Sequence, residues 1–354
     1  MPSILGSGTA HLPYSFHQSD VKPFVKDMFA DIFSDIDRLI GLFENTGIDT
    51  RQFCVPMEWF KNIPGFKEKN SIYIENAVRY GIESLTACME KCQIDIQDIS
   101  HLFYISTTGL ATPSIDVRIL TELGAGPHTK RTPIWGLGCA GGAVGLSRAL
   151  DYVRAYPTEI VAVVAVELCG LTFQRNDLTK SNLVATSLFA DGAAAVLIAG
   201  DQAPVKVKAP IHGIKSMSTY WPDSLDVMGW DFSSSGFHVI FSRDIPTIVK
   251  TRVADEVHSF LKTEKIEQID HYIIHPGGKK VLEAFQEALE IPEEKLDITR
   301  QVLKENGNMS SCTVLYVLNE FIKQQQIHPG EKGLISALGP GFSAEMILVE
   351  GTHS

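Results

Sequence analysis

The sequence predicts an α/β fold made of two similar halves, in which strands are covered by helices. Short apolar runs of strand length alternate with longer segments whose apolar residues recur at helical spacing. Three segments of the first half also resemble segments of the second half in pattern, each displaced by about 170 residues. In such folds, the groups of a site gather where strands end and helices begin.

The expected elements follow this alternation along the chain. The sequence predicts strands at 2–8, 101–107, 134–138, 159–168, 193–200, 271–275, 333–339 and 345–351. It predicts helices at 22–45, 71–92, 114–123, 146–156, 247–262, 278–289 and 310–325, and a loop-rich stretch at 201–235. The sequence therefore predicts parallel sheets with helices between and around them.

The internal repeat divides the chain into two expected halves. The matching pairs are 99–120 with 269–289, 137–154 with 308–323, and 159–170 with 332–341. We expect a first half at 1–200, which contains Cys139, and a second half at 201–354, which contains His275 and Asn308.

Composition excludes several classes of function. The 354 residues carry a net charge of −11 without a cluster of Lys or Arg, which disfavours a nucleic-acid partner. The longest apolar run, 160–166, is too short to span a membrane, and the first residues lack the pattern of a signal peptide. Cys88 and Cys92 lie one helical turn apart without a neighbouring His, so we expect no metal site. A cytoplasmic protein with reduced thiols and no bound cofactor is the expectation.

Cys139 is the first candidate for chemistry. It lies in GLGCAGGAVG, after an apolar strand and before a helix, where backbone N–H groups favour a thiolate. The glycines permit a sharp turn, and we expect them to leave room for a bulky substrate at the sulfur. A free buried cysteine in a glycine-rich turn is the alternative interpretation.

His275 and Asn308 occupy the same kind of position in the second half. His275 ends the strand HYIIH, and Asn308 lies in NGNMSS ahead of a long helix. Each alone is typical of a structural residue or a turn. Cysteine, histidine and asparagine also occur in this order in papain-like proteases, but those have their cysteine near the mature N-terminus and a secreted, disulfide-bearing setting. We therefore disfavour peptide hydrolysis.

Five spaced motifs resemble the chalcone and stilbene synthase family, the type III polyketide synthases. They are GCAGGAVG with Cys139, LFADGAAAV with Phe189, IIHPGGKKVLEAF with His275, GNMSS with Asn308, and ALGPGFSAE with Gly339, Pro340 and Gly341. The resemblance runs from about residue 3 to 350. It implies a five-layered αβαβα thiolase-type fold of two related halves, and a homodimer.

The resemblance also implies a reaction. An acyl-CoA starter loads onto Cys139, malonyl-CoA loses CO₂, and the carbanion attacks the thioester in an iterative Claisen condensation. His275 would stabilise the thiolate, and His275 and Asn308 would donate hydrogen bonds to the enolate oxygen. The departures from plant members fit a fatty acyl starter and an alkylpyrone or alkylresorcinol product.

The resemblance carries further residues over as substrate contacts. Phe189 and Phe237 match the phenylalanines between the CoA tunnel and the cavity, and Thr112 matches a residue that crosses the dimer interface. The expected lining residues are Thr107, Cys169, Thr172, Gly229, Ser310 and the Gly339–Gly341 loop. Only Arg38 falls at a place expected to bind CoA phosphates, with Arg51 and Lys61 as nearby candidates.

Three other functions remain open at this point. A ketoacyl synthase III-like enzyme would use acyl-carrier protein, whose acidity calls for a basic patch that the sequence does not show. A non-catalytic thiolase-fold partner would lack Cys139, His275 or Asn308, and all three are present. A cysteine hydrolase would release free acid from acyl-CoA without consuming malonyl-CoA.

Overall fold

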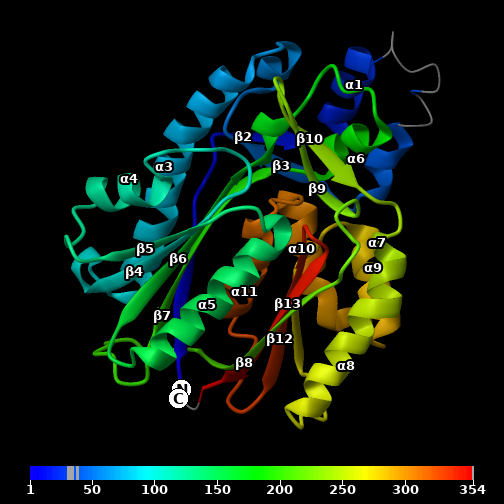
Figure 1. Ribbon diagram of the computed structural model, residues 1–354. Helices are drawn as coiled ribbons and strands as arrows, with labels where there is room; N and C mark the ends of the chain where they lie inside the picture. Colours follow the sequence, from blue (N-terminus) through cyan, green and yellow to red (C-terminus); the bar gives the residue numbers. More distant parts are fainter. Residues whose placement is uncertain (30–35, 37–39, 353–354) are drawn as a thin grey trace.

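The computed structural model describes residues 1–29, 36 and 40–352. Five layers of secondary structure succeed one another across the molecule (Figure 1). Helices α5 and α11 lie side by side in the middle layer, strands flank them on both sides, and α3 with α4 and α8 with α9 cover the outer faces (Figure 1). The predicted α/β architecture with five layers is therefore confirmed.

Nine strands form one continuous mixed sheet in the order β11-β12-β13-β8-β1-β7-β6-β4-β5. The first-half strands are β1 (Ser3–Thr9), β4 (Ile99–Ile105), β5 (Lys130–Ile134), β6 (Ile160–Leu168) and β7 (Asp191–Ala199). The second-half strands are β8 (Ile211–Tyr220), β11 (His271–Ile274), β12 (Lys332–Gly339) and β13 (Ser343–Gly351). The two sets meet where β1 pairs with β8 at only two positions, Ser3 with His212 and Ile4 with Ile211.

The order of strands repeats between the halves. Strands β4, β6, β7 and β1 are joined by one parallel and then two antiparallel pairings. Strands β11, β12, β13 and β8 are joined in the same sequence of directions. The internal repeat is therefore a repeat of topology. The prediction of parallel sheets is wrong for β1, β7, β8 and β13, since each runs antiparallel to both of its neighbours.

The helices that cover the sheet come from corresponding places in each half. The described helices are α1 (Gln18–Phe29), α3 (Phe66–Cys92), α4 (Ile115–Glu122), α5 (Gly141–Ala155), α6 (Lys180–Leu188), α7 (Ile245–Ile248), α8 (Ala254–Thr263), α9 (Lys279–Ala288), α10 (Asp297–Asn306) and α11 (Ser311–Lys323). A π-helical turn at Val249–Val253 joins α7 to α8. Two short two-stranded sheets lie apart from the main sheet: β2 (Tyr14–His17) with β3 (Thr50–Phe53), and the hairpin of β9 (Met228–Ser233) with β10 (Gly236–Phe241).

Alternating side chains of the strands supply three separate cores. In β6, Val161 and Val163 face the central core around α5 and α11, whereas Ala162 and Val164 face α3 and α4. In β12, Ile335 faces the central core and Leu334 faces the core of α8 and α9. Both faces of these strands are buried, which explains why their sequences are continuous apolar runs.

The structure differs from the predicted elements at several places, and it also contains β2, β3, α6, β10 and α10, which were not predicted. The stretch at 201–235, predicted as loops, contains β8 and β9, because polar residues alternate along these strands and hide the pattern of a buried strand. The helix predicted at 22–45 begins earlier, at Gln18, and the residues Gly41–Asn45 form a 3₁₀ turn. The strand predicted at 134–138 lies at Lys130–Ile134.

Candidate active site

Cys139 lies in a 3₁₀ turn, Gly138–Ala140, directly before α5. Gly138 has a φ of +45°, a left-handed conformation that glycine adopts without strain. A Cβ atom at Gly138 would lie 2.7 Å from the Pro340 ring, and one at Gly142 would lie 2.1 Å from the carbonyl oxygen of Ser311. These two glycines therefore permit close packing of the turn and of α5. At these two positions protein atoms fill the space that was expected to admit substrate, whereas nothing lies within 4 Å of a Cβ atom at Gly136.

Asn308 occupies the matching position before α11, and it lies next to Cys139. The Cys139 thiol is 4.0 Å from Asn308 Oδ1 and 3.7 Å from Ser310 Oγ. Asn308 Oδ1 also accepts from the Ser310 N–H, and Asn308 Nδ2 donates to the Gly277 carbonyl at 3.1 Å. Asn308 therefore connects the turn that holds Cys139 to the turn that follows His275.

His275 directly follows β11 and is 4% exposed. Its backbone N–H donates to the carbonyl of Ser336 at 2.8 Å, which fixes the end of β11 against β12. Neither ring nitrogen has a hydrogen-bond partner among the described residues. A buried imidazole with both nitrogens free is available to exchange a proton with a group that enters the site.

Burial favours the neutral forms of both groups. It raises the pKa of the Cys139 thiol to about 12, although hydrogen bonds to Ser310 and Asn308 act in the other direction. Burial also lowers the pKa of His275 to about 3. Burial thus acts against the thiolate that the sequence analysis expects, and it favours a neutral imidazole.

Glu167, near the end of β6, is a residue of the site that the sequence analysis missed. It is fully buried and accepts hydrogen bonds from the Thr107 N–H, the Thr108 hydroxyl and the Ser311 hydroxyl at 2.7–2.9 Å. Burial raises the pKa of this carboxyl. The signal was the single acidic residue in the apolar run IVAVVAVEL.

An apolar cavity, partly open to solvent, extends from Phe189 toward α1. Of the predicted lining residues, it contains Phe189, Phe237, Cys169 and Thr172. The backbone of Phe189 pairs with that of Asn308, because the Asn308 N–H donates to Leu188 and the Ala190 N–H donates to Asn308. Phe189, in the cavity wall, therefore lies directly beside Asn308.

Two lining residues of the apolar cavity were not predicted in that role. The Trp230 ring centroid lies 6.4 Å from that of Phe189 and 5.8 Å from that of Phe237, so Trp230 stands between the two phenylalanines. Arg51, a candidate for CoA phosphates, is instead 2% exposed and donates to the carbonyls of Thr186 and Phe189. Burial lowers the pKa of Arg51 to about 9, and Asp191 opposes this effect. Arg51 therefore holds the Phe189 backbone in the cavity wall.

The other predicted residues fall into three groups. Thr107 and Ser310 contact Glu167 and Cys139 as described, and the Gly339–Gly341 loop packs on the Cys139 turn, where a Cβ atom at Gly339 would lie 2.3 Å from the carbonyl oxygen of Leu137. Gly229 is not among the residues that line the apolar cavity, although its neighbour Trp230 is. Thr112 is exposed on the surface. Arg38 lies outside the described residues, so its CoA-binding role stays a prediction.

Metal sites and membrane-spanning helices are both absent from residues 1–29, 36 and 40–352. No group of three or more His, Cys, Asp or Glu side chains is placed to hold a metal ion in this part of the chain. Within the same residues, no helix is both long enough and apolar enough to cross a membrane.

Comparisons with known proteins agree with the architecture and with the motifs. The N-terminal and C-terminal domain models of chalcone and stilbene synthases match residues 17–202 and 214–353. The chain is 45% identical to a putative chalcone synthase of Bacillus subtilis over 98% of both chains. It is 35% identical to the 1,3,6,8-tetrahydroxynaphthalene synthase of Streptomyces peucetius, over 98% of this chain and 92% of that one.

Solved structures show the same similarity at the level of the fold. The crystal structure of the Streptomyces coelicolor 1,3,6,8-tetrahydroxynaphthalene synthase, a bacterial type III polyketide synthase, superposes with a TM-score of 0.94. That comparison covers 99% of this chain and 100% of the other at 26% identity. Matches to both domain models and to relatives over nearly the full length lead to one conclusion: this chain belongs to the chalcone and stilbene synthase family, the type III polyketide synthases.

Proposed function

We propose that this type III polyketide synthase extends a fatty acyl-CoA starter with malonyl-CoA and cyclises the product to an alkylpyrone or alkylresorcinol. The apolar cavity carries the proposal. Most of its lining side chains are phenylalanine, valine or methionine, and they come from α1, β3, β10 and the segments next to β3 and α6. An aliphatic chain of a starter would bury its surface there at about 25 cal/mol per Å².

In the proposed reaction, Cys139 carries the acyl chain. As the Cys139 sulfur attacks the thioester carbon of the starter, the thiol proton moves to neutral His275, and CoA leaves with a proton. Malonyl-CoA then loses CO₂, and its carbanion attacks the carbonyl carbon of the Cys139 thioester. A carbon–carbon bond forms and the carbon–sulfur bond to Cys139 breaks, which gives a β-ketoacyl-CoA, and the released Cys139 thiolate takes a proton from water.

His275 and Asn308 are proposed to stabilise the enolate oxygen that forms when CO₂ leaves. One such hydrogen-bond donor contributes about 3–4 kcal/mol to transition-state stability in other enzymes. Asn308 suits this role because its amide does not titrate, and its contacts to Ser310 and Gly277 fix its orientation.

The assembly and the location of the protein are proposed on the same basis. We propose a homodimer in the cytoplasm, with the exposed Thr112 loop near the interface. Light scattering of the purified protein measures the mass, and a monomeric mass would contradict the dimer.

A product assay tests the reaction. The purified protein is incubated with malonyl-CoA and one of four starters: acetyl-, hexanoyl-, palmitoyl- or coumaroyl-CoA. Mass spectrometry then measures the products and any acyl group on the intact protein. We expect pyrone or resorcinol products, the most from palmitoyl-CoA, and an acyl adduct on the peptide that contains Cys139.

Matched cysteine variants identify the nucleophile. Cys139→Ala should abolish product and adduct, whereas Cys88→Ala should retain both, because Cys88 is buried under β1 and donates to the carbonyl of Gly6. A coumaroyl-derived product as the major one would contradict the fatty acyl starter. Free fatty acid without malonyl-CoA consumption would contradict the synthase, and turnover only with acyl-carrier protein would favour a ketoacyl synthase III-like enzyme.

A further inference from the structure

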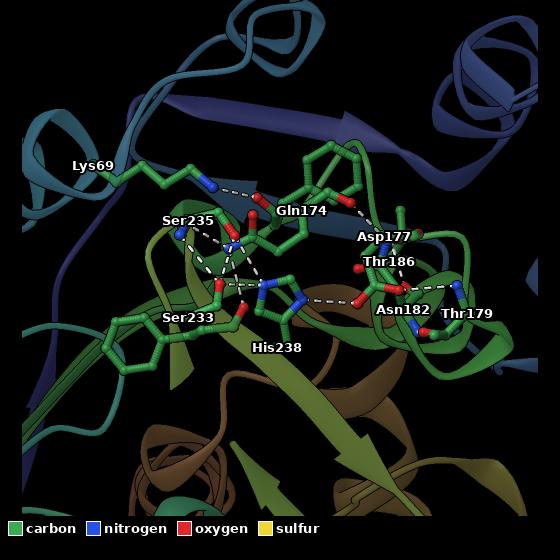
Figure 2. Close-up of polar contacts among 11 residues, drawn as sticks. Lys69, Gln174, Asp177, Thr179, Asn182, Thr186, Ser233, Ser235 and His238 are labelled. Carbon is green, nitrogen blue, oxygen red and sulfur yellow. Dashed lines mark hydrogen bonds and ion pairs between the residues drawn. The ribbon is translucent and has the colours of Figure 1, made fainter. Parts of the chain in front are cut away.

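A second cluster of chemically active side chains lies at the β9–β10 hairpin (Figure 2). Ser233 pairs with Gly236 across the two strands, so Ser234 and Ser235 form a two-residue turn. His238, two residues into β10, lies beneath this turn between the serine hydroxyls and Asp177 (Figure 2). None of these residues contributes to the site around Cys139.

The imidazole of His238 has a different partner on each side. Its Nδ1 lies 3.1 Å from Asp177 Oδ2, and its Nε2 lies 2.9 Å from both Ser233 Oγ and Ser235 Oγ. With Nδ1 protonated toward the carboxylate, Nε2 is an acceptor for a serine hydroxyl. This is the order of contacts in a Ser–His–Asp relay: the acid orients the ring, and the ring accepts the proton of the nucleophile.

Asp177 is held as a carboxylate in this position. Its side chain is 8% exposed, and its Oδ1 accepts from the Thr179 N–H at 2.9 Å. Burial raises the pKa of Asp177, but the hydrogen bonds from Thr179 and His238 outweigh burial and leave the pKa below its ordinary value. Asn182 fixes the backbone by donating to the carbonyls of Gln174 and Asp177.

The side chain of Gln174 fixes the turn that carries the serines. Gln174 Nε2 donates to the carbonyls of Ser235 and Phe237, both at 3.1 Å. Gly236 has a φ of +116°, so the turn requires glycine after Ser235. The serine hydroxyls are 2.8 Å apart, and the Ser235 N–H donates to Ser233 Oγ. The hydroxyls and the imidazole are therefore held in one arrangement.

A polar pocket opens beside the relay. Its walls include Ser235, His238 and Asp177, and also Lys69, whereas Ser233 does not line it. Lys69 is 6% exposed and donates to the carbonyl of Phe173 at 2.6 Å, and within the described residues it has no carboxylate partner. Its ammonium has two further N–H donors, which suits a carbonyl oxygen that becomes negative during acyl transfer.

We propose that Ser235, His238 and Asp177 form a second, serine-dependent centre that hydrolyses short acyl esters and thioesters bound in this pocket. Ser235 Oγ bonds to the acyl carbon and gives its proton to His238 Nε2, which protonates the departing alcohol or thiol. Water then attacks the acyl-serine and gives a proton to His238, and Ser235 regains its proton as the carboxylic acid leaves. Lys69 is assigned to the oxyanion.

Covalent labelling tests this centre without Cys139. The Cys139→Ala protein is treated with a fluorophosphonate, which phosphonylates activated serines, and the labelled peptide is sequenced by mass spectrometry. We expect one adduct at Ser235, and a slower reaction with Asp177→Asn. The fluorophosphonate reacts with a protein whose serines are all unchanged, so the result does not depend on whether a serine variant folds. Absence of an adduct at Ser235 would overturn the proposal.

Hydrolysis of p-nitrophenyl butyrate provides the second readout in the same Cys139→Ala background. Ser235→Ala should lower kcat/KM about 100-fold, the usual scale for loss of a proton relay. Ser234→Ala is the matched control from the same turn, and kcat/KM should stay within about twofold because Ser234 is outside the relay. Equal rates in the two variants would contradict the proposal. Polyketide formation depends on Cys139, so neither result bears on the proposed synthase reaction.

Discussion

At the scale of single residues, the neutral state of Cys139 and His275 determines how the thiol reacts. Both groups are buried, and burial moves their pKa values apart, to about 12 for the thiol and about 3 for the imidazole. Burial therefore disfavours a thiolate–imidazolium pair before substrate binds. The thiol can lose its proton only when His275 accepts it during attack, or when bulk pH approaches the thiol's own pKa.

This state predicts the pH dependence of alkylation. The rate at which iodoacetamide modifies Cys139 in the free enzyme should rise tenfold per pH unit from pH 6 to pH 10 without a plateau, because the thiolate fraction rises with pH below a pKa of about 12. Peptide mass spectrometry measures the rate at Cys139 itself. A plateau near pH 7 would show a preformed thiolate and contradict the assignment.

Burial of neutral His275 also predicts acid sensitivity. Its folded pKa is depressed from 6.5 to about 3, so its contribution to stability is present above pH 6.5 and is lost as pH falls toward 3. The full difference corresponds to about 5 kcal/mol. His275→Gln should therefore lose less unfolding free energy than the wild-type protein between pH 7 and pH 4, as measured by urea unfolding. Parallel losses would contradict this source of acid sensitivity.

At the scale of elements, the close approach of α5 and α11 places Cys139 beside Asn308. Each helix follows a glycine with positive φ, Gly138 in one half and Gly307 in the other. Gly142, in the first turn of α5, lies against the backbone of Ser311 at the start of α11. The distance between the Cys139 thiol and the Asn308 amide therefore depends on the absence of a side chain at Gly142.

A single methyl group tests this dependence. Gly142→Ala should lower the free energy of unfolding by about 2–4 kcal/mol and reduce Cys139 acylation, because its Cβ would meet the Ser311 carbonyl. Gly65→Ala is the control, since nothing lies within 4 Å of a Cβ there and its φ is −70°. Urea unfolding measures both variants, and equal midpoints would contradict the packing argument.

The elements also show what the sequence could reveal. Fully buried strands such as β6 and β7 were predictable because both faces are apolar, and Cys139, His275 and Asn308 were recognisable at strand ends and helix starts. Strands β8 and β9 escaped prediction because their exposed faces are polar. The roles of Arg51, Glu167 and Trp230 depend on partners far away in the sequence, which no local pattern specifies.

At the scale of the whole molecule, Glu167 joins the two halves at the site. Its carboxyl accepts from Thr107 and Thr108 of the first half and from Ser311 of the second. Burial opposes its charge, so the hydrogen bonds and not the charge account for its presence. A neutral residue of the same shape should serve the structure equally well.

The matched pair Glu167→Gln and Glu167→Ala tests this view. The Gln variant should be as stable as the wild-type protein at pH 8, because an amide can accept from Thr107 and Thr108 and donate to Ser311. The Ala variant should lose about 3–5 kcal/mol, since three buried polar groups lose their partner. Calorimetry at pH 8 compares them, and a Gln variant as unstable as the Ala variant would show that the charge is required.

The central place of β1 in the sheet has a consequence for biosynthesis. Residues Ser3–Thr9 leave the ribosome long before their partners, which are β7, ending at Ala199, and β8, beginning at Ile211. At typical rates of elongation, these partners emerge roughly 10–40 s later. During that interval the nascent strand Ser3–Thr9 is unpaired on both edges, so chaperones that bind extended segments have a long opportunity to bind it.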